Sequence, residues 1–197
     1  YPARMMSPGH AGVRNCKWVQ NIEVSGEESK KPWMGKYRGF APDVDFDTLT
    51  TYGLPDCKLR LDQAQIVQEQ PVTSLICNPV PNTILAGNPE TVNVKGIAWT
   101  GGGRGITRVD VSLDGGKNFT AAELIKPIQQ IRNREWAWYH FEKDIPVPAD
   151  MREKLKRGAK VEMELTSKAL DKSFNAQPEY PEPYMNGRGV CISHWYR

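Results

Sequence analysis

Two short segments combine cations with glycines in a way that suits the binding of an anionic ligand. The first spans residues 8–18 and carries Arg14 and Lys17. Its glycines, Gly9 and Gly12, would let the backbone approach a flat ring closely. Arginine and lysine donate charge-assisted hydrogen bonds to phosphate or ring oxygens. The alternative is a surface loop with two solvated cations, and the residues by themselves favour that alternative.

The second segment, residues 186–190, places Arg188 between Gly187 and Gly189. The glycines give the backbone the freedom to bring an arginine against a ligand, and the planar guanidinium matches the geometry of an oxyanion. A structural arginine that caps backbone carbonyls is the competing interpretation.

A glycine-rich stretch at residues 96–119 resembles a phosphate-binding loop only at first sight. After Gly101 and Gly103, the last glycine of a dinucleotide fingerprint would fall on Ile106, and no Gly-Lys-Ser/Thr sequence follows. The residues after it alternate between apolar and polar, which predicts a half-buried strand with Thr107 on the buried side. We therefore expect the glycines to form a bend or bulge between two strands, with a tight hairpin turn at residues 114–116.

Several other segments show the same period of two. They are residues 91–99, 135–141 and 160–167. Strands separated by turn-rich, proline-bearing connections predict an Ig-like β-sandwich over residues 71–197. A helical turn or two is expected in residues 149–160, ended by Gly158.

The composition bounds the class of protein. The chain has 197 residues, a net charge of +3 and no apolar run long enough to cross a membrane, so neither nucleic acid nor a membrane surface is the expected partner. No signal or transit segment opens the chain, which says nothing about compartment because residue 1 is not methionine. The four cysteines form no C-x-x-C pair, which makes a zinc site improbable and favours free thiols.

Four motifs, taken in order, resemble one family. They are PGHAGVRNCKWVQNIEV, AWTGGGRGITRVDVSLDGG, REWAWYHF with NAQP, and NGRGVCISHWYR. Together they closely resemble the sulfite oxidase family of molybdenum enzymes over nearly the whole chain. The resemblance implies a mainly β fold, in which residues 1–66 are the C-terminal portion of a mixed α+β molybdenum-cofactor domain and residues 67–197 are an Ig-like dimerisation domain.

The resemblance also implies roles for particular residues. The molybdenum cofactor would be bound by Arg14, Asn15, Cys16 and Lys17, and sulfite would be bound by Arg188. The cysteine that binds molybdenum in the family is expected upstream, so none of the four cysteines is assigned as a metal ligand, no catalytic residue is assigned, and the chain by itself is expected to be inactive.

The implied function is the oxidation of sulfite to sulfate, with electrons passing to a haem, in a domain outside this chain, or to cytochrome c. The implied assembly is a homodimer formed through the sandwich. Three alternatives stay open: a nitrate reductase, a bacterial sulfite dehydrogenase, or a non-catalytic Ig-like interaction module. Arg188 speaks against nitrate, because the family's nitrate reductases carry methionine at that position. The expected compartment is the mitochondrial intermembrane space, with the peroxisome and the bacterial periplasm as alternatives.

Overall fold

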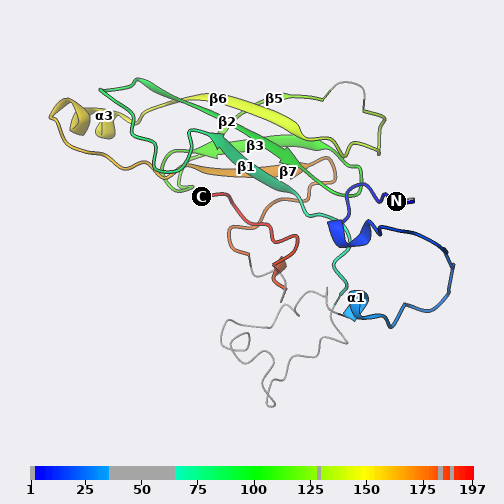
Figure 1. Cartoon of the computed structure of the whole chain (residues 1–197). Coiled ribbons are helices and arrows are strands. Elements are labelled where there is room, and N and C mark those ends of the chain that lie inside the picture. The colour runs from blue at the N-terminus through cyan, green and yellow to red at the C-terminus, as the bar shows by residue number, and fades with distance from the viewer. Residues whose placement is uncertain (1–2, 36–64, 128–129, 182–183, 187–188) are drawn as a thin grey trace, which may run out of the picture. The chain divides into compact units, whose positions relative to one another are not determined.

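The computed structural model describes residues 3–35, 65–127, 130–181, 184–186 and 189–197 (Figure 1). The chain divides into two compact units. One comprises Tyr1–Pro71 and Pro178–Ser193, and the other comprises Val72–Gln177 and His194–Arg197. The excursion of residues 178–193 into the first unit is not indicated by the sequence. The domain boundary near residue 66 stays a prediction.

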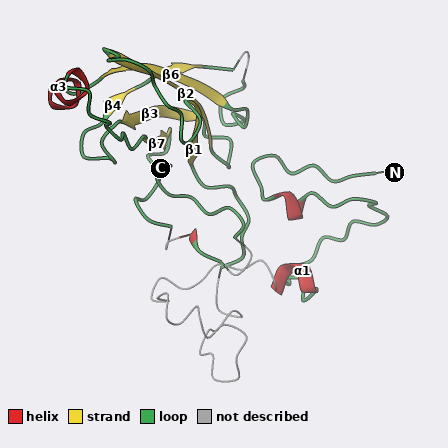
Figure 2. Cartoon of the chain, turned by 60° about the vertical axis from the view of Figure 1, so that its left-hand side comes forward, coloured by secondary structure: helices red, strands yellow, loops and turns green. Residues whose placement is uncertain are grey.

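The second unit is a β-sandwich, as the sequence predicts. Its first sheet has the order β1-β2-β6-β5 and its second the order β4-β3-β7, with antiparallel pairing throughout. The strands are β1 (Thr73–Asn78), β2 (Thr91–Trp99), β3 (Ile106–Ser112), β4 (Thr120–Ala121), β5 (Glu123–Ile125), β6 (Tyr139–Pro146) and β7 (Thr166–Asp171). Figures 1 and 2 show the sheets as two layers, with helix α3 (Ala149–Lys156) at one end.

The alternation of side chains fills the space between the sheets. In β2, Val92, Val94 and Ala98 are buried, and in the facing sheet Val109 and Val111 of β3 are completely buried. These residues belong to one apolar cluster with side chains from both layers. Period-two alternation therefore points one row of each strand into a shared core, as expected for a sandwich.

The start of β3 departs from the simple alternation. The pairing of β3 with β7 is irregular between Ile106 and Arg108, so Ile106 is buried whereas Thr107 is exposed. The expectation that Thr107 lies on the buried side is wrong, because one extra residue in a strand moves the side chains before it to the opposite face. The bulge itself was expected from the neighbouring glycines.

The predicted hairpin joins β3 to β4, but its turn is longer than expected. Residues 113–119 separate the paired strands, and Gly115 and Gly116 have positive φ values of 73° and 91°. The Asp114 carboxylate replaces a tight backbone turn by accepting hydrogen bonds from the amides of Lys117 and Asn118 at 3.0 and 2.9 Å. An aspartate that bonds to amides further along the chain stabilises such wider turns.

Two other predicted strands begin later than the alternation suggests. The segment at residues 160–167 joins a strand ladder only from Thr166, and the segment at residues 135–141 only from Tyr139. Before those points, Glu164 and Glu135 each form only an isolated bridge. Glu135 is instead drawn into hydrogen bonds with the glycine-rich loop, where its amide donates to the carbonyl of Gly103 at 3.1 Å. Side chains can alternate between buried and exposed even where the backbone is not paired in a strand ladder. Tertiary contacts, rather than the alternation, therefore set where the strands begin. Helix α3 agrees with the prediction, and Gly158 follows it at φ 77°.

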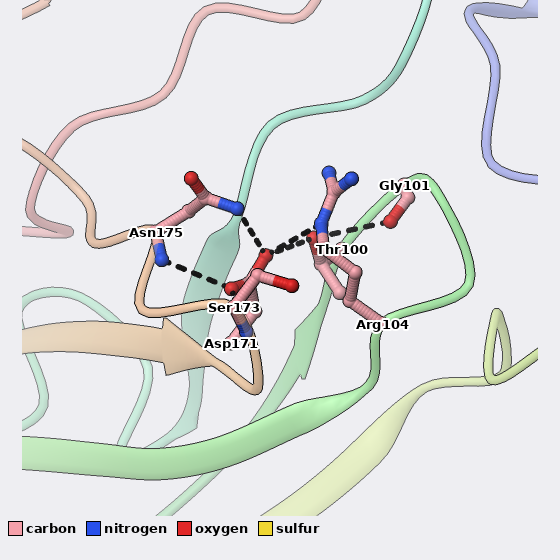
Figure 3. Close-up of polar contacts among 6 residues, drawn as sticks. All are labelled: Thr100, Gly101, Arg104, Asp171, Ser173 and Asn175. Atoms are coloured by element: carbon pink, nitrogen blue, oxygen red, sulfur yellow. Dashed lines mark hydrogen bonds and ion pairs between the residues drawn. The ribbon is translucent and has the colours of Figure 1, made fainter. Parts of the chain in front are cut away.

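A buried ionic cluster holds the glycine-rich loop against the end of β7 (Figure 3). The carboxylate of Asp171 is fully buried and accepts hydrogen bonds from Arg104 Nε at 2.9 Å and Thr100 Oγ1 at 3.1 Å. Asn175 Nδ2 and the Ser173 amide also donate to it, at 2.8 and 2.9 Å. Burial acts to raise the pKa of Asp171, but these hydrogen bonds outweigh it and hold the pKa below its usual value.

The described part of the first unit contains little regular structure. It has a 3₁₀ turn at Gly12–Arg14 and a short helix α1 at Pro32–Gly35, together with isolated strand bridges. None of the helices in the described ranges is both long and apolar enough to span a bilayer.

Candidate functional site

The predicted cofactor loop is closed at its base by backbone hydrogen bonds. The amide of Met5 donates to the carbonyl of Cys16 at 2.9 Å, and the amide of Val19 donates to that of Ala3 at 3.0 Å. Inside the loop, Asn15 Oδ1 accepts a hydrogen bond from the Ser7 amide at 2.7 Å. Asn15 therefore shapes the loop through its side-chain oxygen, and its role in binding a cofactor stays a prediction.

Arg14 turns back onto the chain. Its Nε and Nη2 donate to the carbonyl of Val67 at 3.0 and 2.8 Å, and its Nη1 lies 3.1 Å from Sδ of Met34. A guanidinium that donates two hydrogen bonds to one carbonyl oxygen ties the two segments firmly together. In this structure, Arg14 holds the loop to the segment at residues 65–71 and to helix α1. Its role in binding a cofactor stays a prediction.

The end of the same loop faces outward. Cys16 and Lys17 are exposed, and Trp18 is 69% exposed with a positive φ of 52°. A large side chain in this left-handed region strains the backbone, and the conformation persists only where the surrounding structure holds it. An exposed lysine ammonium beside open backbone has the donor chemistry that an anionic, heteroaromatic cofactor would need. Of the two cations among the four predicted cofactor residues, Lys17 is the exposed one, and its role in binding a cofactor stays a prediction.

Arg188 lies outside the described residues, but its flanks are ordered by one side chain. Asn186 is 7% exposed, and its Nδ2 donates to the carbonyl of Val190 at 2.6 Å. Its Oδ1 accepts from the Val190 amide at 3.1 Å, and the Gly189 amide donates to its backbone carbonyl at 3.1 Å. Asn186 thus connects both sides of the motif that contains Arg188.

The segment at residues 65–71 links these two parts of the first unit. It pairs with the cofactor loop through Ala11 N to Gln68 O at 2.9 Å and Gln70 N to Gly9 O at 2.7 Å. Together with residues of the Arg188 segment, it lines a pocket of about 410 Å³. The lining residues are 65–69, Pro71, Tyr184, Met185, Val190 and Cys191. Segments that are far apart in the sequence therefore share one concave surface.

Cys191 illustrates the electrostatics of this surface. Burial raises the pKa of its thiol, and the positive charge of Arg14 partly opposes that rise. A thiol with a raised pKa is a poor nucleophile at neutral pH. Cys16, Cys77 and Cys191 are free thiols, as the sequence favours, and Cys16 and Cys77 are exposed, while Cys57 lies outside the described residues. In the described ranges, no group of three or more His, Cys, Asp or Glu side chains is arranged to hold a metal ion.

Sequence reasoning missed two contributors to this site. Residues 65–71 carry no recognisable motif, and their role depends on pairing with a loop more than fifty positions earlier. Asn186 could have been found, because asparagine before glycine commonly bonds to the backbone of its own turn.

Comparison with known proteins identifies the family. Residues 64–197 match the Mo-co oxidoreductase dimerisation domain, and residues 1–33 match the oxidoreductase molybdopterin binding domain. The whole chain is 37% identical to a sulfite oxidase from Gallus gallus. The chain belongs to the sulfite oxidase family. The family expectation drawn from the motifs is thereby confirmed, including the order of its two domains.

The sulfite oxidases that this chain matches are considerably longer than it is. The chain spans 38% of the Gallus gallus protein and 46% of an Arabidopsis thaliana sulfite oxidase that is 36% identical over the full chain. Among solved structures, the sulfane dehydrogenase SoxCD from Paracoccus pantotrophus matches 90% of this chain and 37% of its own, with a TM-score of 0.62 and 29% identity.

Proposed function

We propose that the protein carrying this chain is a molybdenum-dependent sulfite oxidase that converts sulfite to sulfate. The observation that carries the proposal is similarity along the entire chain to sulfite oxidases, together with an arginine between two glycines at position 188. Sulfite is a small oxyanion, and a guanidinium offers it paired donors in a fixed plane.

The molybdenum cofactor would be held by the loop at residues 14–17. Lys17 supplies an exposed cation, Cys16 lies beside it on the open side of the loop, and Arg14 and Asn15 hold the loop in shape. When bound, the cofactor supplies the two-electron redox chemistry and the oxygen transfer. The part of this chain is to bind and orient: Arg188 would neutralise the charge of sulfite and fix its position.

The match to a dimerisation domain supports a homodimer formed through the sandwich. We further propose cytochrome c or a haem outside this chain as electron acceptor, and the mitochondrial intermembrane space as compartment. The structural similarity to a bacterial sulfane dehydrogenase favours a second candidate, a bacterial dehydrogenase acting on sulfur compounds in the periplasm.

The test is sulfite-dependent reduction of cytochrome c and of ferricyanide by the full-length protein. For Arg188→Ala we expect KM for sulfite to rise roughly 10- to 150-fold, because a hydrogen bond to a charged group contributes about 1.5–3 kcal/mol. Arg132→Ala, which removes an exposed arginine of the sandwich, is the matched control and should leave KM unchanged.

Each outcome separates the candidates. Turnover of sulfite with ferricyanide but not with cytochrome c would favour the bacterial dehydrogenase. Turnover of nitrate, or a molybdenum-containing protein inactive on sulfite, would overturn the sulfite assignment. A full-length protein without molybdenum would point to a non-catalytic interaction module.

A further inference from the structure

The segment that carries Arg188 leaves the sandwich and returns to it at one place. Gln177 is the last residue of the sandwich before the excursion, and His194 is the first residue after it. Gln177 Nε2 donates to the carbonyl of His194 at 2.5 Å, and Trp195 Nε1 donates to the carbonyl of Gln177 at 3.1 Å. Two hydrogen bonds of opposite direction therefore join the two ends of the excursion.

Gln177 is itself held firmly by the sandwich. It is 4% exposed, and its Oε1 accepts hydrogen bonds from Ser74 Oγ at 2.7 Å and from the Ala169 amide at 2.8 Å. Its backbone amide donates to the carbonyl of Ala169 at 3.2 Å. The amide accepts two hydrogen bonds on its oxygen and donates one from its nitrogen, whereas an ionised glutamate has no donor and a methionine thioether has neither the donor nor the strong acceptor.

The segment that returns to the sandwich, residues 194–197, is anchored as well. Tyr196 and Ser167 exchange two backbone hydrogen bonds of 3.0 Å each. The ring of Trp195 packs edge-on against Phe119 with centroids 5.1 Å apart, and Lys168 Nζ lies 4.9 Å from the Trp195 ring centroid. Both ends of the excursion thus start from fixed points on β7 and its neighbours.

We propose that Gln177, with Trp195, is a positioning residue for sulfite binding, because it pins both ends of residues 178–193 and so restricts the conformations open to the segment that bears Arg188. The inference rests on the proposed role of Arg188. Separating the ends of a loop increases its freedom, and an apparent affinity falls in proportion to the fraction of molecules in the binding-competent conformation. The kinetic signature is a raised KM with an unchanged kcat at saturating sulfite.

We call the contacts of Gln177 and Trp195 that join the two ends of residues 178–193 the clamp. The experiment uses the full-length enzyme with two variants that loosen this clamp differently. Gln177→Met removes every side-chain hydrogen bond at similar volume, whereas Trp195→Phe removes only the bond to the Gln177 carbonyl and keeps an aromatic ring against Phe119. We expect KM for sulfite to rise roughly 2- to 10-fold in each, the change in population that corresponds to losing a neutral hydrogen bond. Val92→Ala, in β2, touches none of these hydrogen bonds, so it is a control that destabilises the core and should leave KM unchanged.

Two further measurements make the test decisive. On the Arg188→Ala background, Gln177→Met should add no further rise in KM, because the clamp acts through the arginine. Hydrogen exchange at the Gly189 and Val190 amides should be faster in both clamp variants than in Val92→Ala. This readout does not depend on turnover.

The outcomes that overturn the inference differ from those that overturn the function. If Arg188→Ala raises KM while the folded clamp variants bind sulfite and exchange hydrogen like the wild type, the clamp is refuted and the function stands. An added KM effect of Gln177→Met on the Arg188→Ala background would likewise refute a positioning role. If Arg188→Ala leaves KM unchanged, the assignment of sulfite to Arg188 fails, and the inference fails with it.

Discussion

At the scale of single residues, Asp171 shows how a buried charge is made tolerable. Its carboxylate is fully buried, yet Arg104, Thr100 and Asn175 all donate to it. Replacing both partners of a buried ion pair often changes stability little, but removing one partner leaves the other charge buried without compensation. The side chain of Arg104 is 29% exposed, so part of its charge would stay poorly solvated without Asp171.

We expect Asp171→Ala to lower the free energy of unfolding of the sandwich by about 3–5 kcal/mol, because it breaks a buried pair from one side. Urea-induced unfolding followed by tryptophan fluorescence measures this. Asp110→Ala removes the partner of Arg108, whose side chain is 57% exposed, and should cost about 0–1 kcal/mol. Equal losses in the two variants would contradict this account.

Asp114 gives a prediction about pH. Burial acts to raise its pKa, but hydrogen bonds from the Ser112 hydroxyl and the Asn118 amide outweigh it and lower the pKa to about 2 from 3.8. A lowered folded-state pKa stabilises the folded protein above the unfolded value, and this stabilisation is lost as the pH falls through the folded value. We therefore expect the urea midpoint of the wild type to fall between about pH 4 and pH 2 more steeply than that of Asp114→Asn. Parallel curves for the two proteins would refute the prediction.

At the scale of elements, the glycine-rich loop is a packing device. The loop runs beside residues 133–135, and Arg104 forms a parallel bridge with Glu135. Glu135 accepts hydrogen bonds from the Tyr139 hydroxyl and from Lys172 Nζ. Burial and the Glu135 carboxylate both raise the pKa of Tyr139, so the phenol keeps its proton as a donor. The glycines are needed because this cluster fills the space where side chains would stand.

Gly105 tests that explanation. It has a φ of 71°, and a Cβ there would lie 2.3 Å from Glu135 Oε2 and 2.8 Å from the Tyr139 hydroxyl. Gly158 has a φ of 77° and nothing within 4 Å of its Cβ position, so it is the matched control. Gly158→Ala should cost about 1 kcal/mol of unfolding free energy for backbone strain, and Gly105→Ala about 1–3 kcal/mol more for the steric conflict. Unfolding in urea measures both, and a similar cost at the two positions would refute the packing role.

At the scale of the whole molecule, the two compact units are interleaved along the chain. The sandwich is completed only by residues 194–197, after the excursion of residues 178–193. A segment fixed to the sandwich at both ends can carry a binding residue without belonging to the sandwich core. The proposed role of Arg188 relies on this connectivity.

We expect the full-length protein to be a homodimer, since residues 64–197 match a dimerisation domain and closed two-fold pairs are the commonest symmetric assembly. Sedimentation velocity across a range of micromolar concentrations measures the mass. A protein that sediments as a monomer throughout that range would overturn the expectation.

The sequence by itself predicted the features that depend on local pattern. Alternation located β2 and most of β3, Gly158 marked the end of α3, and the failed fingerprint at Ile106 excluded a nucleotide loop. Motif order also pointed to the family. Such features follow from residue type and spacing over a few positions, so a linear reading reaches them.

The tertiary structure decided what depends on partners distant in sequence. The bulge that exposes Thr107 comes from the register with β7, and the ends of β6 and β7 come from contacts that compete with the ladder. Arg14 donates a hydrogen bond to the carbonyl of Val67, and Gln177 donates one to the carbonyl of His194. No local sequence pattern predicts either contact. A side chain with several donors can satisfy them in many places, and only the folded chain selects which carbonyl lies within reach.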